Sequence, residues 1–155
     1  MKEFDAKKTA ERIILFIQDY YKKNNLKGAV IGLSGGKDSS VVAGLFTKAL
    51  GSENVHGLWL PCHSKETDKN DAYELANHLG IEISEFDLTN LYDNYVSQIK
   101  NNYDVTDEDL IDANINIKPR LRTLTLYYHA AMLSRKNNGT YIVAGTSNKC
   151  ELYVG

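Results

Sequence analysis

A short apolar run followed at once by a glycine-rich turn constrains the fold of this chain most. Residues 29–33 have the sequence Ala-Val-Ile-Gly-Leu and are followed by Ser34-Gly35-Gly36, after which apolar residues recur at helical spacing. A continuous apolar run of this length is typical of a strand buried on both faces, as in a parallel sheet. The sequence therefore predicts a buried strand that a glycine turn joins directly to a helix.

The same alternation of strands and helices continues along the chain. We expect further strands over residues 55–60, 81–88 and 141–144, and helices over about 5–23, 41–49, 72–79 and 90–100. Gly51 and Gly80 are expected to form left-handed helix caps. The polar, acidic residues 101–114 are interpreted as a loop or short helix. A last helix is expected to begin with Asn116 as its cap and Pro119 in its first turn. Its core face would consist of Leu121, Leu124, Tyr128 and Ala131.

This alternation favours an α/β fold with a doubly wound parallel sheet and helices on both faces. We expect residues 1–155 to form a single domain. Ligands of such sheets bind beyond the carboxyl ends of the strands. The glycine turn, residues 61–64 and residues 145–148 all follow predicted strands. The sequence therefore predicts a ligand site where these three loops meet.

The composition excludes several classes of protein. The chain of 155 residues is 43% hydrophobic and 25% charged, as is usual for a globular domain, and its net charge of −2 gives no reason to expect a nucleic-acid partner. No apolar segment is long enough for a membrane span, and the first residues do not resemble a secretory signal. The two cysteines, Cys62 and Cys150, argue against a disulfide framework and a structural zinc site. We therefore expect a cytoplasmic protein.

The turn over residues 34–40, Ser-Gly-Gly-Lys-Asp-Ser-Ser, is suited to bind phosphate. Glycines let the backbone approach a ligand closely, and the first amides of the following helix attract an anion. A Walker loop is excluded because Ile31 and Asp38 stand where that motif requires Gly and Ser or Thr. An aspartate among phosphates suggests a bridging magnesium ion. The alternative is an ordinary strand-to-helix turn in which Asp38 caps the helix.

Ser34-Gly35-Gly36-Lys37-Asp38-Ser39 resembles the SGGxDS loop of the N-type ATP pyrophosphatases, which have an adenine nucleotide alpha hydrolase-like fold. Two further segments resemble the NAD synthetases in particular. Residues 116–122, Asn-Ile-Lys-Pro-Arg-Leu-Arg, match their NxKxRxR segment, and residues 145–151 are similar to their GTxNxSE segment, with Cys150 in place of the serine. Since the family pattern continues beyond Gly155, the resemblance implies the N-terminal portion of a longer enzyme.

The resemblance implies a ligase that cleaves ATP between its α- and β-phosphates and converts deamido-NAD to NAD with ammonia, releasing AMP and pyrophosphate. It implies a homodimer in which Arg120 contacts deamido-NAD. It also implies that Asp38 and Glu151 hold Mg²⁺. The residues implied in ATP binding are Gly32, Leu33, Ser34, Gly35, Gly36, Lys37, Asp38, Ser39 and Thr146.

Several points stay open at this stage. Arg120 and Arg122 lie roughly 200° apart around a helix, so they do not easily serve the same phosphate, and either could contact the dinucleotide. Of the histidines only His63 lies in a loop at the ligand edge. Tyr127 and Tyr128 are interpreted as core or interface aromatics. No side chain is assigned as nucleophile or general base, because carboxylate and ammonia are already nucleophiles.

Other functions compatible with the glycine turn are a GMP synthetase, a tRNA-thiolating enzyme and an ATP-binding domain without turnover. The first two would share the turn but not residues 116–122, and a thiolating enzyme would normally add paired cysteines. A domain without turnover gives no reason for Asp38 and Glu151 together. The sequence leaves open whether ammonia comes directly from solution or from a glutaminase. Cys150 is interpreted as a buried packing residue.

Overall fold

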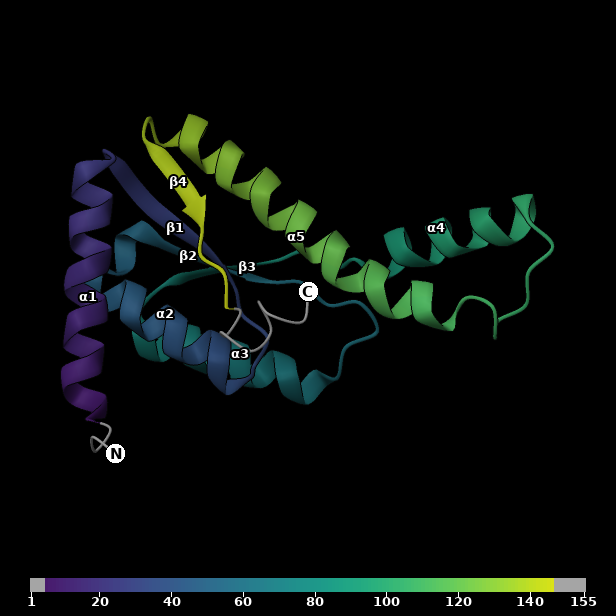
Figure 1. Cartoon of the computed structure of the whole chain (residues 1–155), viewed down its shortest axis with the longest axis horizontal. Coiled ribbons are helices and arrows are strands. Elements are labelled where there is room, and N and C mark those ends of the chain that lie inside the picture. The colour runs from purple at the N-terminus through teal and green to yellow at the C-terminus, as the bar shows by residue number, and fades with distance from the viewer. Residues whose placement is uncertain (1–4, 147–155) are drawn as a thin grey trace.

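The computed structural model describes residues 5–146, which form a parallel sheet covered by helices on both faces (Figure 1). Asp5 caps the first helix by accepting a hydrogen bond from the backbone N–H of Lys8 at 3.0 Å. A 3₁₀ turn, η1, spans Ser52–Asn54. The helices are α1 (Ala6–Lys23), α2 (Lys37–Leu50), α3 (Glu66–Leu79), α4 (Thr89–Asn102) and α5 (Ile111–Lys136). The strands are β1 (Leu26–Gly32), β2 (Val55–Trp59), β3 (Glu82–Glu85) and β4 (Thr140–Val143).

The strand order is β3-β2-β1-β4, and every pairing is parallel. From β1 the chain proceeds outward on one side through β2 and β3, and then returns to the other side of β1 to form β4. Val30 of β1 therefore has His56 as its partner on one side and Val143 on the other. This order confirms the predicted doubly wound sheet, and it places the topological switch point between β1 and β4.

Each face of the sheet carries its own hydrophobic core, because successive side chains of a strand point to opposite faces. Ile31 and Trp59 belong to the core under α1, α2 and α3, whereas Val30 and Leu58 belong to the core under α5. Val30, Ile31 and Leu58 are completely buried. The uninterrupted apolar run of β1 is thus explained by burial on both faces, as the sequence predicts.

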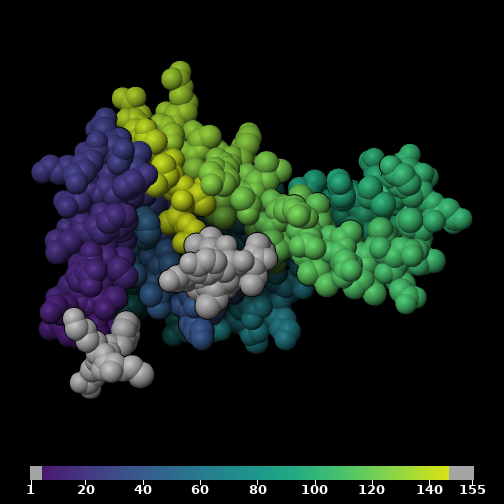
Figure 2. Space-filling model, in the orientation of Figure 1, coloured from purple at the N-terminus to yellow at the C-terminus, as the bar shows by residue number. Residues whose placement is uncertain are grey.

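α4 and the first half of α5 extend away from the sheet as an arm (Figures 1 and 2). The second half of α5 lies on β1 and β4, and its buried side chains include Ala130 and Leu133. The arm carries exposed apolar side chains, among them Tyr95 and Ile115. α5 therefore has two environments along its length, one against the sheet and one largely in solvent.

The start predicted for this last helix is wrong, and of its predicted core face only Leu121 packs against the core. α5 begins at Ile111, so Pro119 lies inside the helix, and the Asn116 side chain donates a hydrogen bond to the carbonyl of Asp112 instead of capping. Proline removes only one helical hydrogen bond, and the carbonyl it leaves unpaired lies on the exposed part of the arm, where water can bond it. The side chains predicted to be buried but found exposed are Leu124, Tyr128 and Ala131.

Two smaller expectations also need correction. Gly51 follows α2 with φ 86° and ψ 148°, which is not the left-handed helical conformation, whereas Gly80 has φ 68° and ψ 25° and is the left-handed cap expected. The third strand ends at Glu85 rather than Leu88. The chain turns away there because the backbone N–H of Leu88 donates to the carbonyl of Pro61, beyond the end of β2, at 2.8 Å.

Candidate functional site

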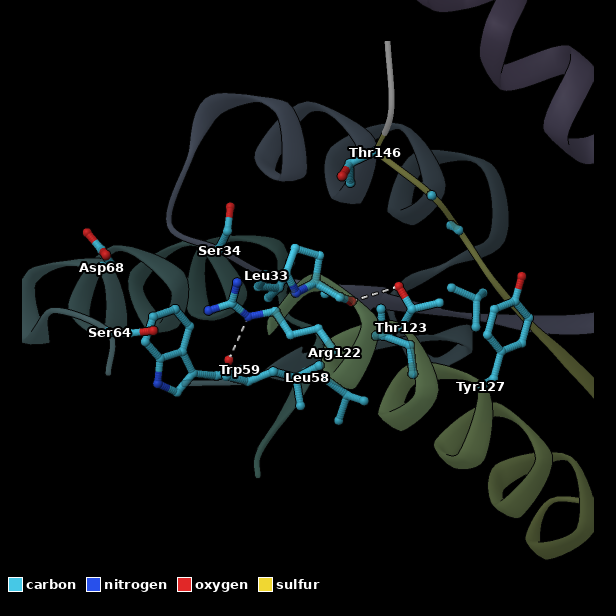
Figure 3. Close-up of a pocket in the computed structure, with 17 residues that line it drawn as sticks. Leu33, Ser34, Leu58, Trp59, Ser64, Asp68, Arg122, Thr123, Tyr127 and Thr146 are labelled. Atoms are coloured by element: carbon cyan, nitrogen blue, oxygen red, sulfur yellow. Dashed lines mark hydrogen bonds between the residues drawn. The ribbon is translucent and has the colours of Figure 1, made fainter. Parts of the chain in front are cut away.

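A cavity of about 610 Å³ opens beyond the carboxyl ends of β1, β2 and β4, at the switch point of the sheet. Figure 3 shows Ser34, Asp68 and Arg122, which come from three different parts of the chain, around this space. The residues that line it include Gly32, Leu33 and Ser34 after β1, Trp59, Ser64 and Asp68 after or at the end of β2, Arg122, Thr123 and Tyr127 of α5, and Gly145 and Thr146 after β4. The predicted convergence of three loops is thus confirmed as far as residue 146.

The glycine turn is shaped by close contact with the start of α3. Gly35 has φ +75°, and a Cβ at this position would lie 2.5 Å from the backbone carbonyl oxygen of Asp68. Only glycine adopts that conformation easily and leaves that space. Gly35 is therefore required both by the backbone and by its neighbour, and Gly36 then becomes the residue before the first turn of α2.

The serines of the turn brace it from inside. Ser39 is buried, and its hydroxyl donates to the carbonyl of Gly36 at 2.9 Å and accepts from the backbone N–H of Ser34 at 3.3 Å. The Ser34 hydroxyl accepts from the N–H of Gly36 at 3.2 Å. Within residues 5–146 no side chain caps the start of α2, so the alternative in which Asp38 caps the helix is not observed. The first-turn amides of α2 stay available for an anion.

The charged side chains of the glycine turn lie outside the cavity, whereas a carboxylate of α3 lines it. Lys37 and Asp38 are exposed in the first turn of α2 and do not line the cavity, whereas Asp68 does. Glu151, and with it the second predicted magnesium ligand, lies outside the described residues, as does Cys150. Within residues 5–146 no group of three histidine, cysteine or acidic side chains is arranged to hold a metal ion.

Arg122, and not Arg120, lines this cavity. The Arg122 Nε–H donates to the carbonyl of Leu60 at 3.1 Å, which holds the half-buried guanidinium at the end of β2 (Figure 3). Arg120 is exposed on the opposite side of α5, as the helical spacing of the two residues requires. A contact between Arg120 and the dinucleotide stays a prediction.

Sequence reasoning did not single out Trp59, Asp68 or Thr123 as site residues. Trp59 ends β2 and is only 4% exposed. An apolar residue at the end of a buried strand is expected in the core, so the sequence gives no sign that Trp59 also lines the cavity. Asp68 occupies the first turn of α3 as Asp38 occupies the first turn of α2. This repetition of an acid at the start of two successive helices is the signal that could have identified Asp68.

Cys62 is buried among the apolar side chains beside the end of β2. Burial raises the pKa of its thiol, although the nearby charges of Lys118 and Arg122 act in the opposite direction. A buried thiol with a raised pKa is a packing residue and not a nucleophile.

A family model described as NAD synthase matches residues 9–155. The chain belongs to the NAD synthase family. Among curated relatives, the NH(3)-dependent NAD(+) synthetase of Carboxydothermus hydrogenoformans is 41% identical over 145 residues, which are 94% of this chain and 56% of that protein. The chain thus spans little more than half the length of this relative.

Solved structures of the family have the same fold. The NH3-dependent NAD synthetase of Campylobacter jejuni, in complex with the nitrate ion, matches with a TM-score of 0.80 and 33% identity over 96% of this chain and 59% of that one. The NMN synthetase of Francisella tularensis matches with a TM-score of 0.81 and 30% identity over 99% of this chain and 59% of that one. The predicted adenine nucleotide alpha hydrolase-like fold is confirmed. None of the helices within residues 5–146 is long and apolar enough to cross a membrane.

Proposed function

We propose that this chain carries the ATP-binding part of an NAD synthetase, which amidates deamido-NAD with ammonia and converts ATP to AMP and pyrophosphate. One observation carries the proposal. In a chain that matches the NAD synthase family, Gly32, Leu33 and Ser34 line a cavity at the switch point of the sheet, and the start of α2 that follows them has no side-chain cap among the described residues. A helix start of this kind attracts the phosphates of a nucleotide.

The proposed reaction has two steps. The nicotinate carboxylate of deamido-NAD attacks the α-phosphorus of ATP, so that a bond from carboxylate oxygen to phosphorus forms and the bond to the β-phosphate oxygen breaks, releasing pyrophosphate. Ammonia then attacks the acyl carbon of this adenylate, loses a proton to solvent, and displaces AMP. Both nucleophiles are already reactive, so the protein contributes mainly orientation and neutralisation of phosphate charge.

We assign these tasks to residues that line the cavity or lie near it. The turn from Gly32 to Ser39 would bind phosphate through backbone amides, and Arg122 would neutralise charge that develops on the departing pyrophosphate. Thr146, on the β4 side of the same cavity, would contact ATP. Arg120 would contact deamido-NAD from outside this cavity.

Mg²⁺ would supply further neutralisation of the phosphates. Asp38 and Glu151 are the ligands that the family resemblance implies, and Asp68 offers a carboxylate inside the cavity. Mg²⁺ commonly uses one or two carboxylates together with phosphate oxygens and water, so the donors near the turn suit this ion without a protein cage of three ligands.

A homodimer is part of the proposal. Leu124, Tyr127 and Tyr128 of α5 are between 63% and 71% exposed, and Tyr127 also lines the cavity. A second copy packed on this face of α5 would bury apolar side chains and lie next to the ligand. Sedimentation of the purified chain before and after Tyr128→Glu tests this, and a wild-type chain that stays monomeric at micromolar concentration would contradict it.

The expected cytoplasmic location and the single domain over residues 1–155 stay predictions.

The activity is tested by incubating the full-length protein that contains this chain with Mg²⁺, ATP and ammonium, with one of three acceptors: deamido-NAD, nicotinic acid mononucleotide or xanthosine monophosphate. We expect NAD, AMP and pyrophosphate with deamido-NAD. Production of ADP would refute the proposed chemistry. AMP formed only with the mononucleotide or only with xanthosine monophosphate would assign a different acceptor. A parallel reaction with glutamine in place of ammonium tests the nitrogen source.

A further inference from the structure

His63 is held in an unusual backbone conformation at the edge of the candidate site. Its φ is 54°, in the left-handed region that non-glycine residues seldom adopt. Such a conformation persists only where surrounding contacts enforce it. Here the backbone N–H of His63 donates to the Thr89 hydroxyl at 3.3 Å, and its imidazole packs edge-on against Tyr92 with ring centroids 5.7 Å apart.

The imidazole of His63 is also bonded to an acid of α4. Its Nε2 lies 2.8 Å from Oδ1 of Asp93. An ionised carboxylate only accepts hydrogen bonds, so Nε2 carries the proton and donates it. Both contacts of His63, to Thr89 and to Asp93, therefore tie one loop residue to the first turns of α4.

The loop tied in this way forms one wall of the cavity. Residues 60–64 connect the end of β2 to α3, and Ser64 lines the cavity. Two further backbone groups of the loop are also bonded: the Leu60 carbonyl accepts from Arg122, and the N–H of Cys62 donates to the Ser64 hydroxyl at 3.2 Å. The side chain of His63 is the only one among residues 60–64 that forms an ion pair with α4 within the described part of the chain.

We propose that the pair of His63 and Asp93 is a positioning device for the nucleotide pocket, fixing the wall that carries Ser64 and adjoins Trp59. His63 is not a catalytic residue in this proposal, because Ser64 and not His63 lines the cavity. The choice of ATP as the ligand rests on the proposed function. The ordering of residues 60–64 by the pair is independent of that function, and it can be measured without ligand.

We expect the loss of this pair to weaken ATP binding only moderately, because both side chains are partly exposed to water. The side chains of His63 and Asp93 are 48% and 52% exposed, and exposed pairs contribute little to stability. Breaking the pair should therefore leave the protein folded and weaken ATP binding about three- to fivefold, through a less ordered wall. kcat should change less than KM for ATP, because the wall does not contact the reacting atoms.

Trp59 provides the measurement, since it is the only tryptophan of the chain and lies next to the wall. We would compare wild type with His63→Ala, Asp93→Ala and the double variant, recording acrylamide quenching of Trp59 without ligand and the Kd for ATP from its fluorescence. We expect more quenching and a higher Kd in each single variant, with no further change in the double variant. Equal quenching in all four proteins would overturn the proposal.

Two further variants separate positioning from a general loss of structure. His63→Gln keeps an N–H donor at about the reach of Nε2 and should restore most of the wild-type quenching and Kd. His78→Ala removes an exposed histidine of α3 and should change neither. If neither the wild type nor any variant bound ATP and no AMP formed, the proposed function would fail. The quenching measured without ligand would still decide whether His63 positions the wall. If His63→Gln behaved like His63→Ala, the hydrogen bond to Asp93 would not be the cause.

Discussion

Replacing Gly35 by alanine tests the geometry of the glycine turn most directly. An L residue at φ +75° costs about 1–2 kcal/mol of backbone strain. The new Cβ would also lie 2.5 Å from the Asp68 carbonyl oxygen, a backbone atom that moves only with the first turn of α3, and such overpacking costs about 1–3 kcal/mol. Gly35→Ala should therefore lower the free energy of unfolding by about 2–5 kcal/mol.

Gly44→Ala is the matched control, because it makes the same chemical change within α2. A Cβ at Gly44 meets nothing within 4 Å, and alanine is favoured over glycine inside a helix by about 0.5–1 kcal/mol. Gly44→Ala should thus stabilise the chain slightly. In thermal unfolding, each kcal/mol corresponds to a shift of roughly 2–4 °C for a chain of this size.

The assay is urea unfolding followed by Trp59 fluorescence, together with titration of each folded variant with ATP. Gly35→Ala should also weaken ATP binding, since α3 must move away from the turn to make room, whereas Gly44→Ala should leave binding unchanged. Equal unfolding midpoints for the two variants would refute the reasoning, because the positive φ and the contact with Asp68 are present at Gly35 and absent at Gly44 among the described residues.

Three further predictions test the site and the core, and the first two have a matched control variant. Arg122→Met should weaken ATP binding about tenfold or more, because an arginine–phosphate contact is lost, while Arg120→Met should leave ATP binding unchanged in the same titration. Leu58→Ala should lower the free energy of urea unfolding by about 2–5 kcal/mol, against less than about 0.5 kcal/mol for the exposed Leu15→Ala. Burial lowers the pKa of His56 below its ordinary value. Between these two pKa values the unfolded chain binds a proton at His56 that the native state does not bind. Stability should therefore fall as the pH drops from 7 to 5, and less steeply in His56→Gln; parallel pH profiles would contradict this assignment.

Local patterns were sufficient for most of the fold. The apolar run of β1 and the glycines after it identify a buried strand and a turn, because burial on both faces and a positive φ each restrict the residue types directly. Gly80 was recognisable as a helix cap for the same reason. The same short stretch identifies the residues of the glycine turn, and phosphate binding by this turn stays a prediction.

The long helix α5 was predicted less well. Asn116 and Pro119 predict a helix start at Asn116, because Asn and Pro are common at helix N-termini, but the helix continues upstream to Ile111 along the arm. Apolar spacing predicts a core face that includes Leu124 and Tyr128, yet both are exposed and Thr125 is buried. A helix with apolar residues on more than one side gives no unique face, so its packing depends on where the sheet lies.

The sequence by itself determined the alternation of strands and helices, the residues of the glycine turn and the edge of the sheet where the cavity lies. Each of these depends on residues close together in the chain, whose conformations and burial patterns are local properties. The tertiary structure decided which arginine of α5 lines the cavity, that Asp68 supports the turn, and that His63 bonds to Asp93. These contacts join segments far apart in the sequence, and they exist only because the order β3-β2-β1-β4 brings the ends of those segments together.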